Sequence, residues 1–382
     1  MTALWSGEQV FWKADKSQKK QAPMINDPKK DFKTVKEHFK NINNMKEFLK
    51  DGCQDFNNNF ELLNFVNSGS CGVVFEGKIK RAPNKRVGLK FLMGKILDEK
   101  REKNNQKKIK ELYFQKKLHH KNITGLYGFY EIKNCSCIAM DYAKYGDLDY
   151  FQKKLIQKKY LSETLIAYIT IQILEGLQYC HQCKIIHMDI KQQNILIDEN
   201  LNIKITDFSV SQSYEQIKEG GKFNLPLAGT SLYMSPEVLG KYEIDVEDCN
   251  KVDMFSLGTL LYNSAFGQFP YQLEYSDRKN FKGIYDKIMQ KNLIFPTIKS
   301  YSLLFKNFLR GLLHKNIKQR YSINDALEDP WIKGTKLIFK EKEKMYDLEK
   351  FLINIVTDNI KLFNDYLKNY RHKVSTTISS SN

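Results

Sequence analysis

The chain has 382 residues, 42% of them hydrophobic, which is enough for one large domain or two modest ones with a real core. No run of about 18 apolar residues occurs, so we expect no transmembrane segment, and the N-terminus lacks the apolar stretch of a secretory signal. The net charge of +17 comes mostly from lysine spread along the chain, without the arginine and aromatic stripes that read nucleic acid, so no nucleic-acid partner is expected.

The cysteines indicate the compartment. Seven cysteines, an odd number, favour free thiols in a reducing, intracellular environment, and we expect a cytoplasmic or cytoskeleton-associated protein. Cys180, His181, Cys183 and His187 are close in sequence, but no second cysteine pair follows at the spacing of a zinc finger. A zinc site is therefore not expected.

The first half of the chain begins with a polar extension and continues as strands. Residues 1–59 are rich in lysine and asparagine. Apolar or alternating runs at 60–79 and 86–93, broken by glycine and polar turns, are typical of strands, and a lysine-rich stretch at 97–118 predicts a helix.

After residue 147 the pattern becomes mainly helical. Leu165, Ile169, Ile173 and Leu177 recur every four residues behind Ser162, which can cap the helix that they predict. The sequence therefore predicts an α+β protein with a small β-rich lobe followed by a larger helical lobe.

The last section, residues 333–382, predicts a long helix followed by a polar tail. Its apolar positions keep a 3,4 spacing, namely Met345, Leu348, Leu352, Ile355, Leu362 and Tyr366. Such a seam most often packs on the protein's own body and otherwise serves a partner or self-association. Ile360, Phe363, Leu367 and Tyr370 also share roughly one face among basic residues, as in a calmodulin-binding or autoinhibitory segment, although nearby acidic residues argue against this interpretation.

Two features of the strand region point to phosphate. Gly69 and Gly72 lie in a loop that leads into an alternating strand, which favours a hairpin lid over a nucleotide rather than a dinucleotide-binding turn into a helix. Lys90, inside an apolar strand, implies an anionic partner, for which Glu111 on the next helix is a candidate. The alternative is a lysine at a strand edge that reaches water.

The stretch HMDIKQQN, residues 187–194, stands between two apolar runs and carries an acid, a base and an amide. Asp189 can accept a proton from a hydroxyl nucleophile, and Lys191 can neutralise a phosphoryl oxygen. Asn194, together with Asp207 at the end of another apolar strand, offers oxygen atoms suited to Mg²⁺, whose coordination triphosphate oxygens would complete.

In this order, these residues resemble the eukaryotic protein kinase superfamily, serine/threonine type, over residues 60–332. The matches are the glycine loop, Lys90 with Glu111, a hinge at MDYAKYGDL, the catalytic loop 187–194, DFS at 207–209, GTSLYMSPE at 229–237, Asp253 and Arg320. The resemblance implies a bilobal kinase-like fold with an N-lobe at 60–140, a hinge at 141–146 and a C-lobe at 147–332. It also implies ATP and Mg²⁺ as cofactors and a protein as substrate.

The resemblance assigns roles to individual positions. It places catalysis on Asp189, Lys191 and Asn194, magnesium binding on Asn194 and Asp207, and ATP binding on Gly69, Gly72, Val74, Lys90, Glu111, Asp141, Ala143, Asp147, Leu196 and Asp207. Glu237 and Arg320 are expected to form a buried structural pair. The likeness is closest to the calcium/calmodulin-dependent kinase group and its activating kinases.

Four positions depart from the family pattern. Asn67 replaces the first loop glycine, Ser209 replaces the glycine after Asp207 and Phe208, and Gln115 stands where a hydrophobic residue usually does. Met188 replaces the arginine that reads an activation-segment phosphate, so phosphorylation is expected to matter less. None removes a catalytic group. The alternative is a kinase-fold scaffold, weakly active or inactive, docked in a larger assembly through residues 1–59 and 333–382.

Overall fold

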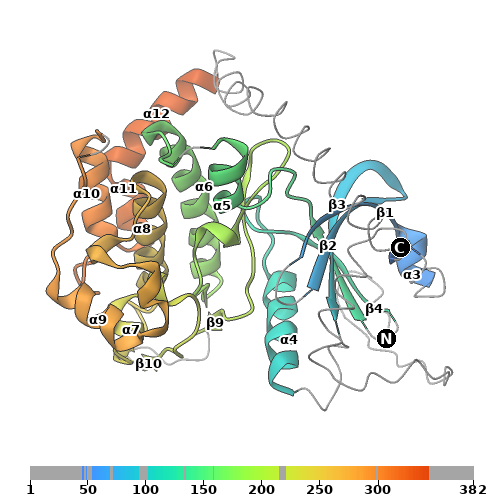
Figure 1. Cartoon of the computed structure of the whole chain (residues 1–382), viewed down its shortest axis with the longest axis horizontal. Helices are drawn as coiled ribbons and strands as arrows, with labels where there is room; N and C mark the ends of the chain where they lie inside the picture. Colours follow the sequence, from blue (N-terminus) through green and yellow to red (C-terminus); the bar gives the residue numbers. More distant parts are fainter. Residues whose placement is uncertain are drawn as a thin grey trace, which may run out of the picture. The chain divides into compact units, whose positions relative to one another are not determined.

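The computed structural model describes residues 45–46, 49, 54–68, 72–93, 102–132, 135–157, 159–214, 221–297 and 300–343. The chain divides into two compact units (Figure 1). The first comprises residues 1–119 and 124–143, and the second comprises residues 120–123 and 144–382. The first unit is built on a sheet and the second is mainly helical, so the predicted α+β architecture is confirmed.

The first unit contains one antiparallel sheet of five strands in the order β1-β2-β3-β5-β4. Its strands are β1 (Phe60–Ser68), β2 (Gly72–Ile79), β3 (Ala82–Met93), β4 (Leu126–Ile132) and β5 (Cys135–Asp141), and its helices include α3 (Gln54–Asn59) and α4 (Glu102–Lys117).

The side chains of β3 point alternately into the core of this unit and to the opposite face, where Lys90 lies. Leu89 and Phe91 are fully buried in a core cluster shared with Phe56 and Phe75. Lys90 lies between them, and because successive strand residues point to opposite faces, it shares the other face with Leu92. On that face Leu112 of α4 packs against a second cluster that includes Leu92.

The second unit is assembled around α8 (Lys251–Phe266). Its other helices are α5 (Leu148–Tyr150), η2 (Phe151–Leu155), α6 (Glu163–Gln182), η3 (Gln192–Asn194), η4 (Ser231–Tyr233), α7 (Pro236–Leu239), η5 (Pro270–Gln272), η6 (Tyr275–Lys279), α9 (Phe281–Gln290), α10 (Leu303–Leu312), α11 (Ile323–Glu328) and α12 (Pro330–Glu343). α8 is buried almost all round, as expected of a helix that is mostly apolar on every face. Ser162 caps α6 by accepting a hydrogen bond from the Leu165 amide, as predicted.

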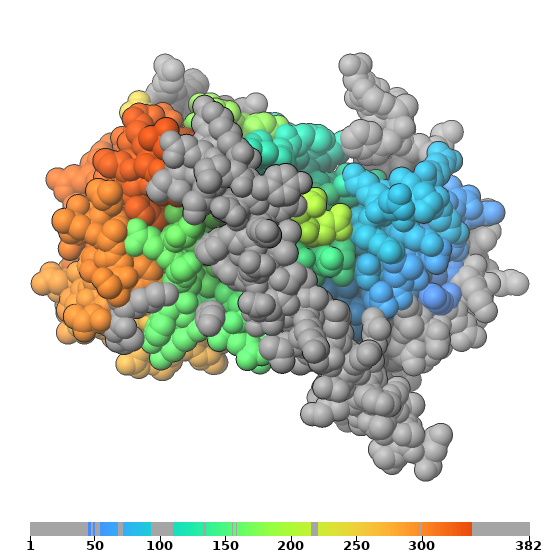
Figure 2. Space-filling view, turned by 90° about the horizontal axis from the view of Figure 1, so that it is seen from above, coloured from blue at the N-terminus to red at the C-terminus, as the bar shows by residue number. Residues whose placement is uncertain are grey.

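Short strand pairs connect these helices. They are β6 (Ile185–Ile186) with β9 (Gln212–Ser213), β7 (Ile195–Ile197) with β8 (Ile203–Ile205), and β10 (Lys222–Asn224) with β11 (Glu243–Asp245). The loop 187–194 lies between β6 and β7, as its flanking apolar runs predict. α12 packs against α10 and α11, and these helices form part of the adjoining orange and red surface in Figure 2.

Several predictions fall on residues that the structure does not describe. These are Gly69, most of the extension 1–59 and the predicted helix seam from Met345 to Tyr366. Among the described residues, no helix combines the length and the apolar character needed to span a membrane.

Candidate active site

The first unit holds the predicted lysine and its counter-charge. Lys90 Nζ lies 3.0 Å from Glu111 Oε1 of α4, and the Glu111 side chain is only 7% exposed. A carboxylate at this depth requires a cationic or hydrogen-bonding partner. The predicted pairing of Lys90 with Glu111 is therefore present, while the role of both residues in ATP binding stays a prediction.

The backbone around Lys90 is tightly packed. Lys90 faces Val74 on β2 and Ile138 on β5. A Cβ at Gly72 would lie 1.9 Å from the carbonyl oxygen of Phe91, so no larger residue fits between β2 and β3 there. Strand packing thus requires a glycine at position 72, in addition to the role in ATP binding that the sequence predicts for Gly72.

The end of β5 is fixed by the Asp141 side chain. Its carboxylate accepts hydrogen bonds from the Gly125 amide at 2.8 Å and from the Tyr127 hydroxyl at 2.6 Å. Burial and the bond to Asp141 both raise the pKa of Tyr127, so this hydroxyl remains protonated and donating. The backbone that leads to Ala143, the predicted adenine contact, is held by these two bonds.

The catalytic loop, residues 187–194, is held at its start by the carboxylate of Asp253 on α8. The two Asp253 carboxylate oxygens accept from the amides of His187 at 2.9 Å and Met188 at 2.8 Å, and His181 Nε2 lies 3.0 Å away. Met188 has a φ of +71°, a conformation that costs a non-glycine residue about 1 kcal/mol. The Asp253 hydrogen bonds offset this strain.

Asp189 is the centre of a hydrogen-bonded cluster. Its Oδ2 accepts from Lys191 Nζ at 2.6 Å and Asn194 Nδ2 at 3.0 Å, and its Oδ1 accepts from the Thr230 amide at 2.7 Å. Lys191 Nζ also lies 2.7 Å from Thr230 Oγ1. The fold therefore brings together the three residues predicted to be catalytic and adds Thr230 from a distant segment.

Asn194 and Asp207 stand at adjacent ends of two paired strands. Asn194 precedes β7 and Asp207 follows β8, and in an antiparallel pair these two ends are neighbours. The Thr206 amide donates to the Asn194 carbonyl at 3.0 Å. Among the described residues, no three His, Cys, Asp or Glu side chains gather closely enough to hold a metal alone. An amide and a carboxylate nevertheless fit a Mg²⁺ ion that takes its remaining ligands from phosphate and water.

Asp147 and Leu196, both predicted to contact the nucleotide, lie together in the second unit. An isolated β-bridge joins their backbones. The Asp147 carboxylate caps α5 by accepting from the Tyr150 amide at 2.9 Å, and burial raises the pKa of this carboxyl. Asp147 therefore has a local structural role in addition to the predicted one.

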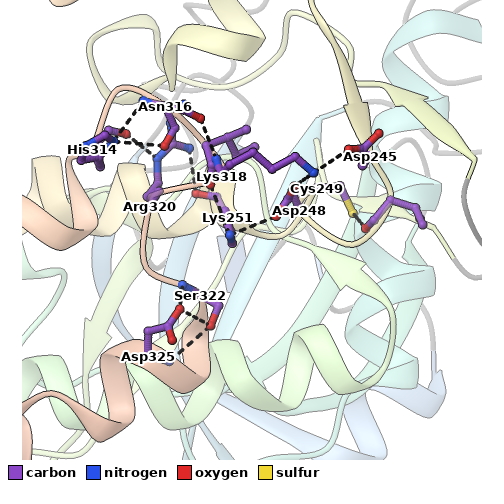
Figure 3. Close-up of polar contacts among 12 residues, drawn as sticks. Asp245, Asp248, Cys249, Lys251, His314, Asn316, Lys318, Arg320, Ser322 and Asp325 are labelled. Carbon is purple, nitrogen blue, oxygen red and sulfur yellow. Dashed lines mark hydrogen bonds and ion pairs between the residues drawn. The ribbon is translucent and has the colours of Figure 1, made fainter.

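The segment from Asp207 to Glu237, the activation segment, is fixed at its end by the predicted buried pair. Arg320 meets Glu237 through two bonds, 2.5 Å from Nη1 to Oε1 and 2.9 Å from Nη2 to Oε2. Arg320 Nε also donates to the His314 carbonyl at 2.9 Å, and Figure 3 shows Arg320 close to His314 and Lys251. This bidentate geometry is the strong form of the arginine–carboxylate pair.

Sequence reasoning missed two residues of this region, Gln192 and Tyr233. Gln192 is only 2% exposed and Tyr233 is 6% exposed, and they are hydrogen-bonded to each other. A glutamine in a loop is ordinarily exposed, so nothing in the sequence marks Gln192 as buried.

Comparisons with known proteins agree with this geometry. The family described as "Protein kinase domain" matches residues 60–332. The chain belongs to the protein kinase family. It is similar to the "Probable serine/threonine-protein kinase MARK-A" of Dictyostelium discoideum, with 27% identity over 81% of this chain and 26% of the relative.

Two further relatives show how much of each protein the likeness covers. The "NUAK family SNF1-like kinase 1" of Homo sapiens is 30% identical over 74% of this chain and 40% of its own length. The "Serine/threonine-protein kinase Aurora-1" of Arabidopsis thaliana is 31% identical over 72% of this chain and 86% of its own. This kinase thus spans less than half of the first two relatives, and the expected likeness to the calcium/calmodulin-dependent group stays a prediction.

Proposed function

We propose that this kinase transfers the γ-phosphoryl group of ATP to serine or threonine hydroxyls of protein substrates, with Mg²⁺ as the metal. The observation that carries the proposal is the cluster in which Asp189 binds Lys191, Asn194 and Thr230 at once. A scaffold has no need of this arrangement, so the intact cluster supports the enzyme over the inactive alternative.

Each side chain of the cluster has a chemical task. Asp189 is placed to orient the substrate hydroxyl and take its proton, while Lys191 offsets the negative charge of the transferring group. Lys90 would hold ATP phosphate oxygens, with Glu111 fixing its ammonium group, and Asn194 and Asp207 would hold Mg²⁺. The metal, when bound, neutralises phosphate charge; positioning and electrostatic stabilisation account for the remaining catalysis.

Two substitutions test the proposal. Asp189→Asn and Lys90→Met should each lower phosphate transfer to a generic basic protein by about 100-fold or more, because each removes a group that acts on the reacting atoms. Labelled phosphate incorporation measures the rate, and thermal unfolding reports the fold.

A matched control tests whether the loss of a surface lysine is by itself enough to lower the transfer rate. Lys78→Met removes a lysine of β2 that pairs with Glu61 at the surface, and it should leave the transfer rate unchanged. Unchanged incorporation in Asp189→Asn or Lys90→Met would overturn the assignment of roles.

We also infer a reducing, cytoplasmic or cytoskeleton-associated location and docking to partners, calmodulin among the candidates, through residues 1–59 and 333–382. Cys135, Cys137, Cys180, Cys183 and Cys249 are free thiols in the described part of the chain, which supports the reducing environment. Fluorescence localisation of the full chain tests the location, and comparison with a variant that ends at residue 343 tests docking through the C-terminal segment.

A further inference from the structure

Gln192 lies in the catalytic loop beside Lys191, yet its side chain is hydrogen-bonded to α8 and η4 rather than to Asp189. Its Nε2 donates to Asn263 Oδ1 at 3.0 Å and the Leu260 carbonyl at 3.2 Å, with Ser264 Oγ at 3.3 Å. Because the Leu260 carbonyl can only accept, the nitrogen of the amide must face α8 and the oxygen must face away.

The amide oxygen of Gln192 serves Tyr233. The Tyr233 hydroxyl donates to Gln192 Oε1, and burial raises the pKa of this hydroxyl, so it remains a donor. The Tyr233 ring stands edge-on to the ring of Phe269. The backbone carbonyl of Tyr233 accepts a hydrogen bond from Ser256 Oγ at 2.9 Å. Such a buried hydroxyl cannot turn to water, and losing its acceptor leaves a polar group unsatisfied.

These contacts close a ring through the active site. Asp189 binds Lys191 and the Thr230 amide, Thr230 leads directly into η4 with Tyr233, and Tyr233 returns to Gln192, which follows Lys191. The separation between the catalytic loop and the segment 230–233 is therefore set from one side by Asp189 and from the other by Gln192.

We propose that Gln192 is a positioning residue, which sets the spacing between the catalytic loop and the segment 230–233 so that a protein hydroxyl reaches Asp189 in the reactive geometry. This inference rests on the proposed kinase activity. An apolar residue of similar size would fill the same space, but it would not fix the distance between the two segments. The hydrogen bonds of the Gln192 side chain are all satisfied only at one spacing. The network makes the spacing specific, and transfer to a protein hydroxyl is the step that depends on it.

The test compares transfer to protein with transfer to water. Gln192→Leu removes both hydrogen-bonding groups and should lower kcat for protein phosphorylation about tenfold or more, since misplacement by about 1 Å is costly to orientation. ATP hydrolysis to water and the KM for ATP should stay within about twofold of the wild type, because water needs no segment to present it and Lys90 and Asp207 are untouched.

A glutamine outside the catalytic loop provides the matched control. Gln290, at the end of α9, is exposed, so Gln290→Leu makes the same chemical change without touching the network and should leave both rates unchanged. Tyr233→Phe, which removes one hydroxyl, should show the same split at about three- to tenfold and carries the test if Gln192→Leu does not fold.

A pH profile adds a readout that a general loss of packing does not give. In Gln192→Glu the ionised carboxylate accepts from Tyr233 but has no donor for the Leu260 carbonyl, whereas the protonated form has one. Burial raises the pKa of such a carboxyl, so the rate relative to wild type should rise as the pH falls.

The outcomes separate the inference from the proposed function. Equal losses of protein phosphorylation and ATP hydrolysis in Gln192→Leu, or no loss in either, would overturn the positioning role. Failure of the wild-type protein to phosphorylate the substrate in the same assay would instead overturn the kinase activity on which the inference rests.

Discussion

Met188 stands directly before the proposed catalytic aspartate, at a position where the family pattern has an arginine. Its side chain is buried at 5% exposure and has no group that can bind a phosphate, while its amide is held by Asp253. The position usually carries an arginine that orders the activation segment through a phosphate on that segment. Met188 carries no charge and cannot make this interaction with a phosphate.

We therefore expect phosphatase treatment of the purified kinase to change its activity less than about twofold, because no arginine at this position gains or loses a phosphate partner. Activity toward a generic basic protein, measured before and after treatment with loss of phosphate checked by mass, gives the answer. A tenfold or larger loss would show that another cation reads the phosphate.

The Tyr127 hydroxyl gives a second prediction at the scale of one residue. It donates to Asp141, whose backbone is the predicted adenine contact. Tyr127→Phe should raise the KM for ATP about three- to tenfold with little change in kcat, because one neutral-to-charged hydrogen bond is worth about 1.5–3 kcal/mol at most and only part of it reaches the nucleotide.

Tyr113→Phe removes a hydroxyl from an exposed tyrosine of α4 and serves as the control, with no expected change in KM. A kcat loss without a KM change in Tyr127→Phe would contradict the role of Asp141 at the nucleotide.

At the level of single residues, sequence reasoning succeeded where the chemistry itself limits the options. A lysine in an apolar strand needs an anion, and Glu111 supplies it. It failed at Gln192, because a loop glutamine becomes buried only through Tyr233 and Asn263, which follow it in the chain by 41 and 71 residues. No local pattern reports contacts of that range.

Among the secondary-structure elements, β10 and β11 hold part of the activation segment. Phe223 pairs with Ile244, and the Val246 amide extends the pairing by donating to the Gly221 carbonyl at 3.1 Å. The three residues of β10 and of β11 show no periodicity that predicts a strand, whereas the four-residue repeat of α6 is long enough to predict a helix. The short strands β6, β7 and β8 were predictable because each is an apolar or alternating run beside a recognisable polar motif, which β10 and β11 lack.

Lys318 fixes the end of β11, as Figure 3 shows. Its Nζ lies 2.5 Å from Asp245 and 2.6 Å from Asp248, and Lys251 lies 3.0 Å from Asp248. Burial alone would raise the pKa of Asp248, but the hydrogen bonds from Lys318 and Lys251 hold it below its ordinary value of 3.8. The bonds to Asp245 and Asp248 raise the pKa of Lys318 above 10.5.

These directions fix how stability depends on pH. The lowered pKa of Asp248 contributes stability above 3.8 that is lost as the pH falls through the folded-state value. The raised pKa of Lys318 contributes stability below 10.5 that is lost as the pH rises through its folded-state value. The contribution of the cluster is therefore constant from about pH 5 to about pH 9.

Lys318→Gln should accordingly lower the Tm slightly, by about 1 °C, equally at all pH values between about 5 and 9, and less in about 1 M salt. Thermal unfolding at several pH values and two salt concentrations measures this. Lys333→Gln, which breaks an exposed pair with Glu328, should have no effect, and a deficit that varies across this pH range would contradict the assignment.

On the scale of the whole molecule, each unit has a core of its own, and the second contains a buried ion pair between residues that are far apart in the chain. Arg320 lies 83 residues from Glu237, and it also donates to the Lys251 carbonyl, 69 residues away. One fully buried guanidinium thus joins α7, the start of α8 and the loop 314–320. The family pattern predicted Glu237 with Arg320, but not the carbonyl contacts, since backbone positions cannot be read from residue types.

Removal of this guanidinium should destabilise the second unit strongly. Arg320→Met leaves Glu237 buried without its partner and three segments without their common donor, so the free energy of unfolding should fall by about 3–5 kcal/mol. Denaturant unfolding measures the total, and hydrogen exchange should show the greatest loss of protection in α7, the start of α8 and residues 314–320. Arg310→Met, at an exposed arginine, should cost less than about 0.5 kcal/mol. If Arg320→Met costs no more than this control, the pair with Glu237 does not stabilise the second unit.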